Sequence, residues 1–396
     1  MPPRGLSLPD EAARRVLAGC PVLDLALLPS PGAAAEPGRP LHLLDAHGGM
    51  LASAVADPEN EVIRVLSTDP VDSFDLAFFR RKALAALRLR QALGLVDGVS
   101  AYRLLNGEGD GLSGFVADVY GPFVVLYVYA KGLINLGRLL AQAILETAGP
   151  QGIVLKVRPK GGPSPGRVKQ ESIGAEPPSK LTVLENGVPF EIHLEGGLNV
   201  GLFTDMREHR RGLRRFAAGR SVLNTFAYTG ALSVTAALAG ASAVTSVDLS
   251  SGVLKWAREN FRLSGLDPDA PRYRFETNDV IRFLKEEVQR KARYDTIILD
   301  PPTYSAARAA GWSMKNDYPD LIALAAELLP RDAPGFLWVS ANTHKSRALL
   351  RHVEEGMVKA KRTARVLEVG GLPPDYPTPL EYPEARYLEV CYLQVD

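Results

Sequence analysis

Strands and helices alternate regularly along the second half of the chain, and this alternation constrains the fold more than any other feature. Six short apolar segments have strand character: residues 221–226, 243–248, 272–277, 294–300, 335–340 and 363–369. Segments with apolar side chains at helical spacing lie between them: residues 230–240, 251–265, 279–291, 317–329 and 345–359. Short strands separated by helices of roughly 10–15 residues indicate βαβ units. We therefore predict an α/β fold with a parallel, doubly wound sheet, to which residues 387–395 add a terminal strand.

Length and composition narrow the class of protein. A chain of 396 residues is long enough for two or three domains, and 46% hydrophobic with 23% charged residues is ordinary for a soluble globular protein. No apolar run is long enough to cross a membrane, and the first residues lack the basic and apolar segments of a secretory signal. The two cysteines, Cys20 and Cys391, exclude a disulfide framework and a cysteine-only zinc site, and the six histidines show no metal-ligand spacing. These features predict a cytoplasmic protein without a metal.

The first half of the chain lacks the regular alternation and divides into two further regions. Residues 41–66 alternate apolar and polar side chains with turn signals between them, which is typical of half-buried strands. We predict three domains: a β-rich domain over 1–70, a central α+β domain over 71–195 and the α/β domain over 196–396. In the central region the pattern predicts helices over 72–95 and 133–147, a hairpin turning at Asn186-Gly187, and a mobile Gly-, Pro- and Ser-rich loop over 161–178.

The first strand of the α/β domain runs into a turn that opens a helix, and this turn contains Gly230. In a doubly wound sheet, ligands bind beyond the carboxyl ends of the strands, and a residue without a β-carbon allows close approach. A dinucleotide site would need the three glycines of G-x-G-x-x-G, whereas this turn has only one. The turn therefore favours S-adenosyl-L-methionine, which carries no phosphate, over NAD.

Carboxylates follow the next two strands. Asp248 ends the second strand, where a carboxylate can accept hydrogen bonds from both ribose hydroxyls; its alternative role is to cap the following helix, although Ser250 could be that cap instead. Asp279 follows the third strand and could accept from an adenine amino group while Val280 packs on the ring, and its alternative role is again a helix N-cap. The residues assigned to the cofactor at these strand ends are Asn224, Phe226, Tyr228, Gly230, Asp248, Leu249, Asn278, Asp279, Val280 and Asp300.

The fourth strand is followed by the most specific motif in the sequence, Asp300-Pro301-Pro302-Thr303-Tyr304. An acidic residue and two prolines form a rigid turn that presents carbonyl groups beside a methyl donor. Base-modifying methyltransferases use such a turn to hold a nucleobase in the plane of transfer, and an aromatic residue such as Tyr304 can stack on an extruded base. The alternative is a Pro-Pro loop that only ends a strand.

Several longer motifs occur in order: NGEGDGLSG at 106–114, GLFTDMREHR at 201–210, LNTFAYTGALSV at 223–234, VTSVDLS at 244–250, WAREN at 256–260 and DPPTYS at 300–305. With these motifs, the chain from about residue 40 to the end resembles the RlmI type of large-subunit ribosomal RNA methyltransferases. The resemblance implies a PUA-like RNA-binding domain, a central hairpin domain and a Rossmann-like class I methyltransferase domain, for which a terminal strand is typical. It also implies S-adenosyl-L-methionine as cofactor, ribosomal RNA as partner and a homodimer, and it places Phe203, Asp205 and Arg207 around the cofactor pocket.

The chain departs from this family in two places. Residues 1–40 lack the basic, tryptophan-containing opening of the PUA-like domain, which is therefore degenerate here. Cytosine carbon-5 methylation in this family relies on a cysteine after the fifth strand, because a thiolate must first add to the ring, and residues 339–344 contain no cysteine. The combination of DPPTYS with Ser340-x-Asn342 is instead similar to the RlmK-type enzymes, which methylate guanine at ring nitrogen 7. Transfer to a ring nitrogen needs mainly proximity and alignment.

We therefore predict direct methyl transfer to a ring nitrogen, with Asn342 hydrogen-bonded to the base edge. The alternative is an exocyclic amine, whose protons Asp300 could accept. The residues assigned to catalysis are Asp300, Pro301, Pro302, Tyr304 and Asn342.

The net charge of +1 argues against binding nucleic acid through bulk positive charge, so the local distribution matters. A basic cluster beside the predicted cofactor site is expected to contribute to RNA docking, and its alternative is a solvated helix face: Arg207, Arg210, Arg211, Arg214 and Arg215. The leading hypothesis is a methyltransferase for a base of large-subunit ribosomal RNA. A small-molecule methyltransferase and a non-catalytic RNA-binding or assembly factor are the alternatives, and the intact Asp248, Asp279 and DPPTY argue against the second.

Overall fold

The computed structural model describes residues 4–28, 32, 36–69, 72–96, 100–158, 169–302, 304–305, 312–343 and 347–396, with only the backbone at 304–305 and 312–316. These residues belong to two compact units. The first comprises Met1–Leu184, Ile192–Val200 and Pro374–Ala385, and the second comprises Glu185–Glu191, Gly201–Pro373 and Arg386–Asp396. The three-domain division stays a prediction.

The N-terminal part of the first unit is a mixed five-stranded sheet in the order β1-β3-β4-β5-β2. Its strands are β1 (Arg4–Ser7), β2 (Val22–Asp24), β3 (Pro40–Leu44), β4 (Met50–Asp57) and β5 (Val62–Ser67). The β-rich character is confirmed, but the sequence did not predict the helix α1 (Asp10–Leu17). This helix is short and buries only Ala12, Ala13 and Val16, too few apolar positions to stand out as a helical period.

A second five-stranded sheet of the first unit has the order β10-β9-β8-β7-β6 and packs with helices α2 (Leu76–Ala92) and α3 (Ile134–Ala148). Its strands are β6 (Ala101–Asn106), β7 (Phe115–Tyr120), β8 (Phe123–Val128), β9 (Gly152–Val157) and β10 (Gln170–Gly174). Helix α2 begins later than predicted because the Asp75 carboxylate accepts a hydrogen bond from Phe78 N at 2.9 Å and caps it.

Two predictions about the region that follows had different outcomes. The loop predicted over 161–178 is wrong in part, because residues 170–174 pair with β9 as an antiparallel edge strand, and residues 159–168 lie outside the described residues. The predicted hairpin is confirmed as β11 (Leu181–Glu185) and β12 (Val188–Ile192). Asn186 and Gly187 have φ of 51° and 78°, the left-handed conformation that a two-residue hairpin turn requires.

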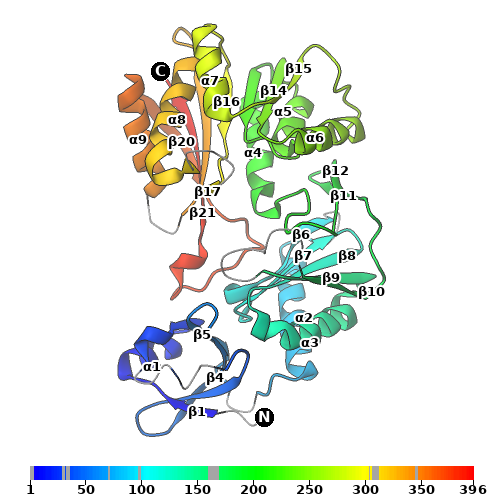
Figure 1. Ribbon diagram of the computed structural model, residues 1–396, viewed down its shortest axis with the longest axis vertical. Helices are drawn as coiled ribbons and strands as arrows, with labels where there is room; N and C mark the ends of the chain where they lie inside the picture. Colours follow the sequence, from blue (N-terminus) through cyan, green and yellow to red (C-terminus); the bar gives the residue numbers. More distant parts are fainter. Residues whose placement is uncertain are drawn as a thin grey trace. The chain divides into compact units, whose positions relative to one another are not determined.

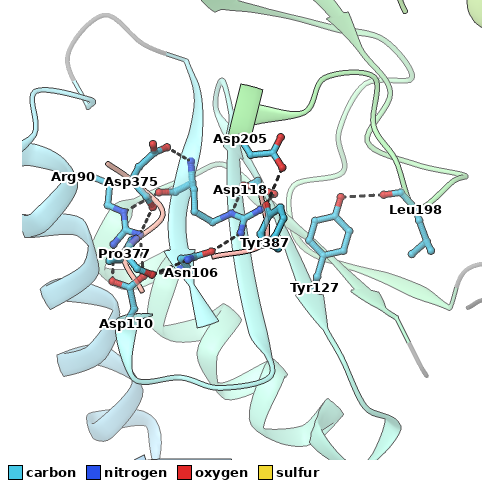
Figure 2. Close-up of polar contacts among 11 residues, drawn as sticks. Arg90, Asn106, Asp110, Asp118, Tyr127, Leu198, Asp205, Asp375, Pro377 and Tyr387 are labelled. Atoms are coloured by element: carbon cyan, nitrogen blue, oxygen red, sulfur yellow. Dashed lines mark hydrogen bonds and ion pairs between the residues drawn. The ribbon is translucent and has the colours of Figure 1, made fainter. Parts of the chain in front are cut away.

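The NGEGDG motif of the first unit holds a late segment of the chain against β6 (Figure 2). Arg90 of α2, whose side chain has no exposed surface, donates to both carboxylate oxygens of Asp110 at 2.6 and 2.9 Å and to the carbonyl of Asp375 at 2.7 Å. Asn106 donates to the carbonyl of Pro377 at 2.8 Å. A β-carbon on Gly109 would lie 1.8 Å from that same carbonyl oxygen. The motif is therefore a binding surface for Pro374–Ala385, built from charge-assisted hydrogen bonds and a close backbone approach.

The second unit contains a seven-stranded sheet in the order β15-β14-β13-β16-β19-β21-β20 (Figure 1). Its strands are β13 (Ser221–Thr225), β14 (Ala243–Asp248), β15 (Tyr273–Thr277), β16 (Thr296–Leu299), β19 (Gly335–Asn342), β20 (Ala364–Gly370) and β21 (Leu388–Val395). The pairs from β15 to β19 are parallel, and β21 runs antiparallel to both of its neighbours. A short β-ribbon, β17 (Tyr304–Ser305) and β18 (Trp312–Ser313), follows β16. The predicted doubly wound α/β fold with a terminal strand is confirmed.

Helices cover both faces of this sheet. α5 packs with α4 and α6, whereas α8 packs with α7 and α9 (Figure 1). Their bounds are α4 (Arg207–Ala217), α5 (Ala231–Leu238), α6 (Ser251–Leu263), α7 (Val280–Gln289), α8 (Met314–Leu328) and α9 (Ala348–Ala360). One apolar core joins the strand residues Leu223, Ile297 and Leu337 to helix residues such as Phe283 and Leu321. None of the helices in the described part of the chain combines the length and apolar character needed to cross a membrane.

Candidate functional site

The direction of the sheet order changes at the pair β13–β16. From β13 the chain proceeds outward to β14 and β15, and it then returns to β16 and proceeds to β19 on the other side. Thr225 is paired with Leu299, and Leu299 with Val339. The residues that follow β13, β16 and β19 therefore meet at one edge of the sheet, where doubly wound folds bind ligands.

The turn after β13 has an unusual backbone. Phe226 and Tyr228 have φ of 55° and 48°, a conformation that is costly for residues with bulky side chains. Asp248 stabilises this turn, because its Oδ2 accepts a hydrogen bond from Tyr228 N at 2.9 Å while its Oδ1 accepts from Ser250 N at 2.9 Å. Ser250 is the N-cap of α6, so the alternative role considered for Asp248, that of capping this helix, is wrong. Asp248 is thus held at the tip of β14 by two backbone donors, with its orientation fixed.

Gly230 ends the turn and begins α5 with φ of 76°. A β-carbon here would lie 2.7 Å from Ala257 Cβ of α6, too close for any side chain. Glycine is therefore required for both the backbone conformation and the packing of α6 on the turn. Its predicted contact with a cofactor stays a prediction.

The WAREN motif of α6 joins the turn to the GLFTDMR motif. Asn260, fully buried, donates to the carbonyl of Thr229 at 2.8 Å and accepts from Glu191 N at 2.8 Å. Trp256 donates to the carbonyl of Glu191 at 3.0 Å, and its ring fills the space that a β-carbon on Gly201 would need. Thr229 in turn donates to the carbonyl of Gly201 at 2.5 Å. The three motifs therefore form one connected structure at the edge of the sheet.

An aromatic pair lies at this edge. The rings of Phe203 and Tyr228 are 5.4 Å apart, and Phe203 is 47% exposed. Burial raises the pKa of Tyr228 to about 12, so its hydroxyl is neutral at physiological pH. Phe203 therefore presents an accessible apolar face beside the strained turn, as a pocket wall would.

Other residues assigned to the cofactor are placed differently. Asn224 is buried and donates to Ser233 Oγ at 2.8 Å, while its Oδ1 has no hydrogen-bond partner among the residues that the structure describes. Asp279 caps α7, because its Oδ1 accepts a hydrogen bond from Arg282 N at 3.0 Å. The helix N-cap considered as its alternative role is therefore observed. Asn278 donates to Glu286 at 3.3 Å, Val280 packs in the core, and Leu249 is 49% exposed. The adenine contacts proposed for Asp279 and Val280 stay predictions.

Asp300 follows β16 and lies beside Ser340 of β19, whose hydroxyl donates to its Oδ1. The pKa of Asp300 is raised to about 6, chiefly by burial and to a smaller extent by the nearby Asp205, while the Ser340 hydrogen bond and Arg210 oppose the shift. Pro301 is buried and Pro302 is exposed. Asn342 is exposed at the end of β19, two residues beyond Ser340. The Tyr304 side chain, expected to stack on a base, lies outside the described side chains.

The basic cluster on α4 does not form one surface, so the expectation that all five arginines dock RNA is wrong. Arg207 and Arg210 are only 1% and 4% exposed. Arg210 donates to both carboxylate oxygens of Glu185 at 2.6 Å and to the carbonyl of Phe203 at 2.6 Å, which fixes the loop before α4. The side chains of Arg211 and Arg215 are exposed, with ion pairs to Glu208 and Glu368.

Sequence reasoning missed two residues at the edge of the sheet, Ser340 as a partner of Asp300 and Tyr318. Tyr318 of α8 has no exposed surface and donates to the carbonyl of Ser340 at 2.6 Å. A tyrosine inside a helix next to a proline gave no sign of this role, because the contact depends on the packing of α8 against two strand ends.

Comparison with known proteins decides the family. Residues 137–376 match the family described as S-adenosylmethionine-dependent methyltransferase. The chain is 31% identical over 361 residues to ribosomal RNA large subunit methyltransferase I of Erwinia tasmaniensis, covering 90% of each chain. The protein of the same name from Escherichia coli O127:H6 is 30% identical over 359 residues, 89% of each chain. The chain belongs to this methyltransferase family.

Solved structures agree with the assignment. A putative SAM-dependent methyltransferase from Streptococcus mutans superimposes with a TM-score of 0.85 at 26% identity and covers 99% of this chain and 100% of its own. A putative methyltransferase complexed with SAH has a TM-score of 0.87 at 25% identity, with the same coverage. The methyltransferase is therefore an enzyme with S-adenosyl-L-methionine as cofactor, as predicted.

The residues at the edge of the sheet fit this cofactor. The fixed carboxylate of Asp248 suits the two hydroxyls of a ribose, since each of its oxygens accepts one backbone hydrogen bond and has a second lone pair. The exposed ring of Phe203 supplies an apolar wall, and the single glycine of the turn leaves no cradle for a pyrophosphate.

Replacing Asp248 with alanine is expected to weaken cofactor binding by roughly 1–3 kcal/mol, because hydrogen bonds to the ribose and the support of the Tyr228 turn are both lost. Isothermal titration calorimetry measures this directly. Asp269→Ala, which removes an exposed carboxylate paired with Arg258, is the matched control and should leave the affinity unchanged. Equal affinities for Asp248→Ala and wild type would show that the ribose assignment is wrong.

Proposed function

We propose that this methyltransferase transfers a methyl group to a nitrogen of a base in large-subunit ribosomal RNA. The observation that carries the proposal is the position of Asp300. It precedes two prolines and accepts a hydrogen bond from Ser340, and the segment that follows Ser340 contains no cysteine. The names of the relatives, ribosomal RNA large subunit methyltransferase I, support the substrate class.

S-adenosyl-L-methionine supplies an electrophilic methyl group on its sulfonium sulfur. The chain's own residues then have to hold a base edge in line with that group. Pro301 and Pro302 fix the backbone after β16, so that carbonyl groups there can accept from the base, and Asn342 offers an exposed amide to the same edge. If the acceptor is an exocyclic amine, Asp300 takes the proton that the nitrogen loses. A ring nitrogen with an in-plane lone pair loses no proton.

Neither cysteine supports a carbon-5 mechanism. Cys391 is fully buried in β21, and burial raises the pKa of its thiol to about 12, so the thiolate is scarcely populated at neutral pH. Cys20 is also buried, within the N-terminal module. This placement supports direct transfer without a covalent protein–RNA adduct.

The experiment that tests the proposal uses transfer of a labelled methyl group from S-adenosyl-L-methionine to large-subunit ribosomal RNA. Labelled RNA should form, and a parallel reaction with RNA containing 5-fluorocytidine should give no adduct stable to denaturation. Fluorinated cytosine traps cysteine-dependent enzymes because the added thiol cannot be eliminated. A stable adduct, or 5-methylcytidine as the product, would contradict the proposed mechanism.

RNA docking is expected to involve the exposed part of the basic cluster, Arg211 and Arg215. Replacing both with alanine should weaken RNA binding and lower the slope of log K against log salt by about 1–2, since each phosphate contact contributes about 0.7–0.9. Arg262→Ala removes an exposed arginine of α6 that is also paired with a glutamate three residues away, Glu259, and is the matched control. Fluorescence anisotropy at several salt concentrations measures the slope, and a slope equal to that of wild type would exclude these arginines from the interface.

Three further points stay proposals. We place the enzyme in the cytoplasm, in keeping with two buried, free cysteines. The degenerate PUA-like domain over 1–70 contributes little to RNA binding, because residues 1–40 lack the basic, tryptophan-containing opening of that domain. A homodimer rests on the family resemblance alone, and sedimentation velocity would show it as a species of twice the 42.8 kDa chain mass.

A further inference from the structure

Asp300 is held by a buried polar relay that joins two strand ends to a helix. Ser340 is 2% exposed and donates its hydroxyl hydrogen to Asp300 Oδ1. Val339, the residue before it, is paired with Leu299, the residue before Asp300. The two side chains are thus brought together by the register of β16 and β19.

Tyr318 fixes the backbone of the same two strands. Its hydroxyl donates to the carbonyl of Ser340 at 2.6 Å and lies 3.3 Å from the carbonyl of Leu299. Burial raises the pKa of Tyr318 well above its ordinary value, so the hydroxyl stays a neutral donor. The Tyr318 hydroxyl of α8 therefore links the backbones of the two strand ends that carry Asp300 and Asn342.

We propose that Ser340 and Tyr318 are positioning residues for the methyl-transfer site. Ser340 orients the Asp300 carboxylate and favours its ionised form directly, and Tyr318 acts through Ser340. This inference rests on the proposed function of Asp300. Neither residue needs to touch the RNA base or the cofactor. Their effect is on the orientation and protonation of the Asp300 carboxyl.

The electrostatic surroundings give the relay a measurable signature. Asp205 of the loop before α4 raises the pKa of Asp300, while Arg210 of α4 and the Ser340 hydrogen bond lower it. Tyr318 of α8 is uncharged. Without the Ser340 hydroxyl, the ionised carboxylate loses its hydrogen-bond donor, so the pKa of Asp300 should rise above about 6. If the Ser340 hydroxyl had no effect on the Asp300 carboxylate, its removal would leave the pKa of Asp300 unchanged.

The test compares Ser340→Ala, Ser340→Thr and Tyr318→Phe with wild type. For Ser340→Ala we expect a lower kcat, cofactor affinity within about twofold of wild type, and an acidic limb of the pH–rate profile that moves to higher pH. Ser340→Thr keeps the hydroxyl and should restore the limb. Tyr318→Phe keeps the ring and should lower kcat without weakening cofactor binding.

Matched controls separate positioning from stability. Thr296→Val and Tyr294→Phe remove buried hydroxyls from the opposite end of β16, where Thr296 donates to the carbonyl of Phe216 at 2.5 Å and Tyr294 to Glu287 at 2.6 Å. They should lower thermal stability as much as the test variants do, without moving the pH profile.

A direct titration keeps the inference independent of the substrate. Carboxyl carbon NMR of aspartate-labelled enzyme, with Asp300→Asn used for assignment, follows the Asp300 carboxyl in wild type and in Ser340→Ala. An upward shift of its pKa in Ser340→Ala supports the inference, and an unchanged pKa overturns it. Failure of the wild-type enzyme to methylate ribosomal RNA would overturn the proposed function instead, while the titration would still decide the role of Ser340.

Discussion

Replacing Asp300 with asparagine or alanine is expected to lower turnover at least about 100-fold while cofactor affinity stays within about threefold, because a group that positions the acceptor acts mainly on the transition state. The carboxylate lies beside Ser340 at the edge of the sheet, where the strand order changes direction between β13 and β16. Single-turnover methylation and calorimetry on the same preparations measure the two quantities. A cofactor affinity that falls as far as the turnover would place Asp300 in the cofactor pocket rather than at the acceptor.

The raised pKa of Asp300 allows loss of activity to be separated from loss of folding. Its pKa is raised to about 6 in the folded enzyme, so the favourable contribution present at low pH is lost as pH rises from its unfolded pKa of about 4 through 6. Asparagine carries no charge, and Asp300→Asn should therefore be more stable than wild type at pH 8, by about 1–3 kcal/mol. Loss of activity in a more stable variant cannot be attributed to unfolding. In wild type, the rate should fall as pH decreases below about 6.

Replacing Arg90 with methionine is expected to destabilise the first unit by about 3–5 kcal/mol, because it leaves the nearly buried Asp110 carboxylate without its charged partner. The change also removes the donor to the carbonyl of Asp375 and so weakens the attachment of Pro374–Ala385, which then depends on contacts such as that of Asn106 with Pro377. Urea denaturation followed by circular dichroism measures the loss. Tryptophan fluorescence reports only on the second unit, since Trp256, Trp312 and Trp338 all lie there.

Arg80→Met is the matched control for Arg90. Arg80 lies on the same helix and is paired with Glu146, but both side chains are substantially exposed. Exposed ion pairs contribute about 0–1 kcal/mol, so this variant should unfold close to wild type. If Arg90→Met were as stable as Arg80→Met, the contacts of Arg90 with Asp110 and with the carbonyl of Asp375 would make no net contribution to folding.

The sequence predicted the second unit well because its signals are local and repeated. Each strand and each helix has its own periodic pattern of apolar residues. The dipeptide Asn186-Gly187 is typical of a two-residue hairpin turn. The helix α1 and the edge strand β10 were missed for the opposite reason. α1 buries three small residues, and β10 forms because β9 offers an unpaired edge to a segment with little strand character of its own.

The candidate site was predictable only as far as each residue's position along its own strand. Asp248 and Asp300 were assigned to strand ends from spacing, and the fold brings those ends to one edge. Whether a polar side chain is buried, and which partner it contacts, depends on packing between segments that are distant in the sequence. Arg210 is buried because Glu185, 25 residues earlier, reaches it, and no spacing rule distinguishes it from the exposed Arg211. The link from Tyr318 to Ser340 is of the same kind.

The central claim is that this enzyme methylates a nitrogen of a base in large-subunit ribosomal RNA. Mass spectrometry of nucleosides from ribosomal RNA of cells with and without the gene tests it most directly. The account predicts that one nitrogen-methylated nucleoside disappears without the gene and returns with the wild-type enzyme but not with Asp300→Ala. An unchanged set of modified nucleosides, or the loss of 5-methylcytidine instead, would contradict it.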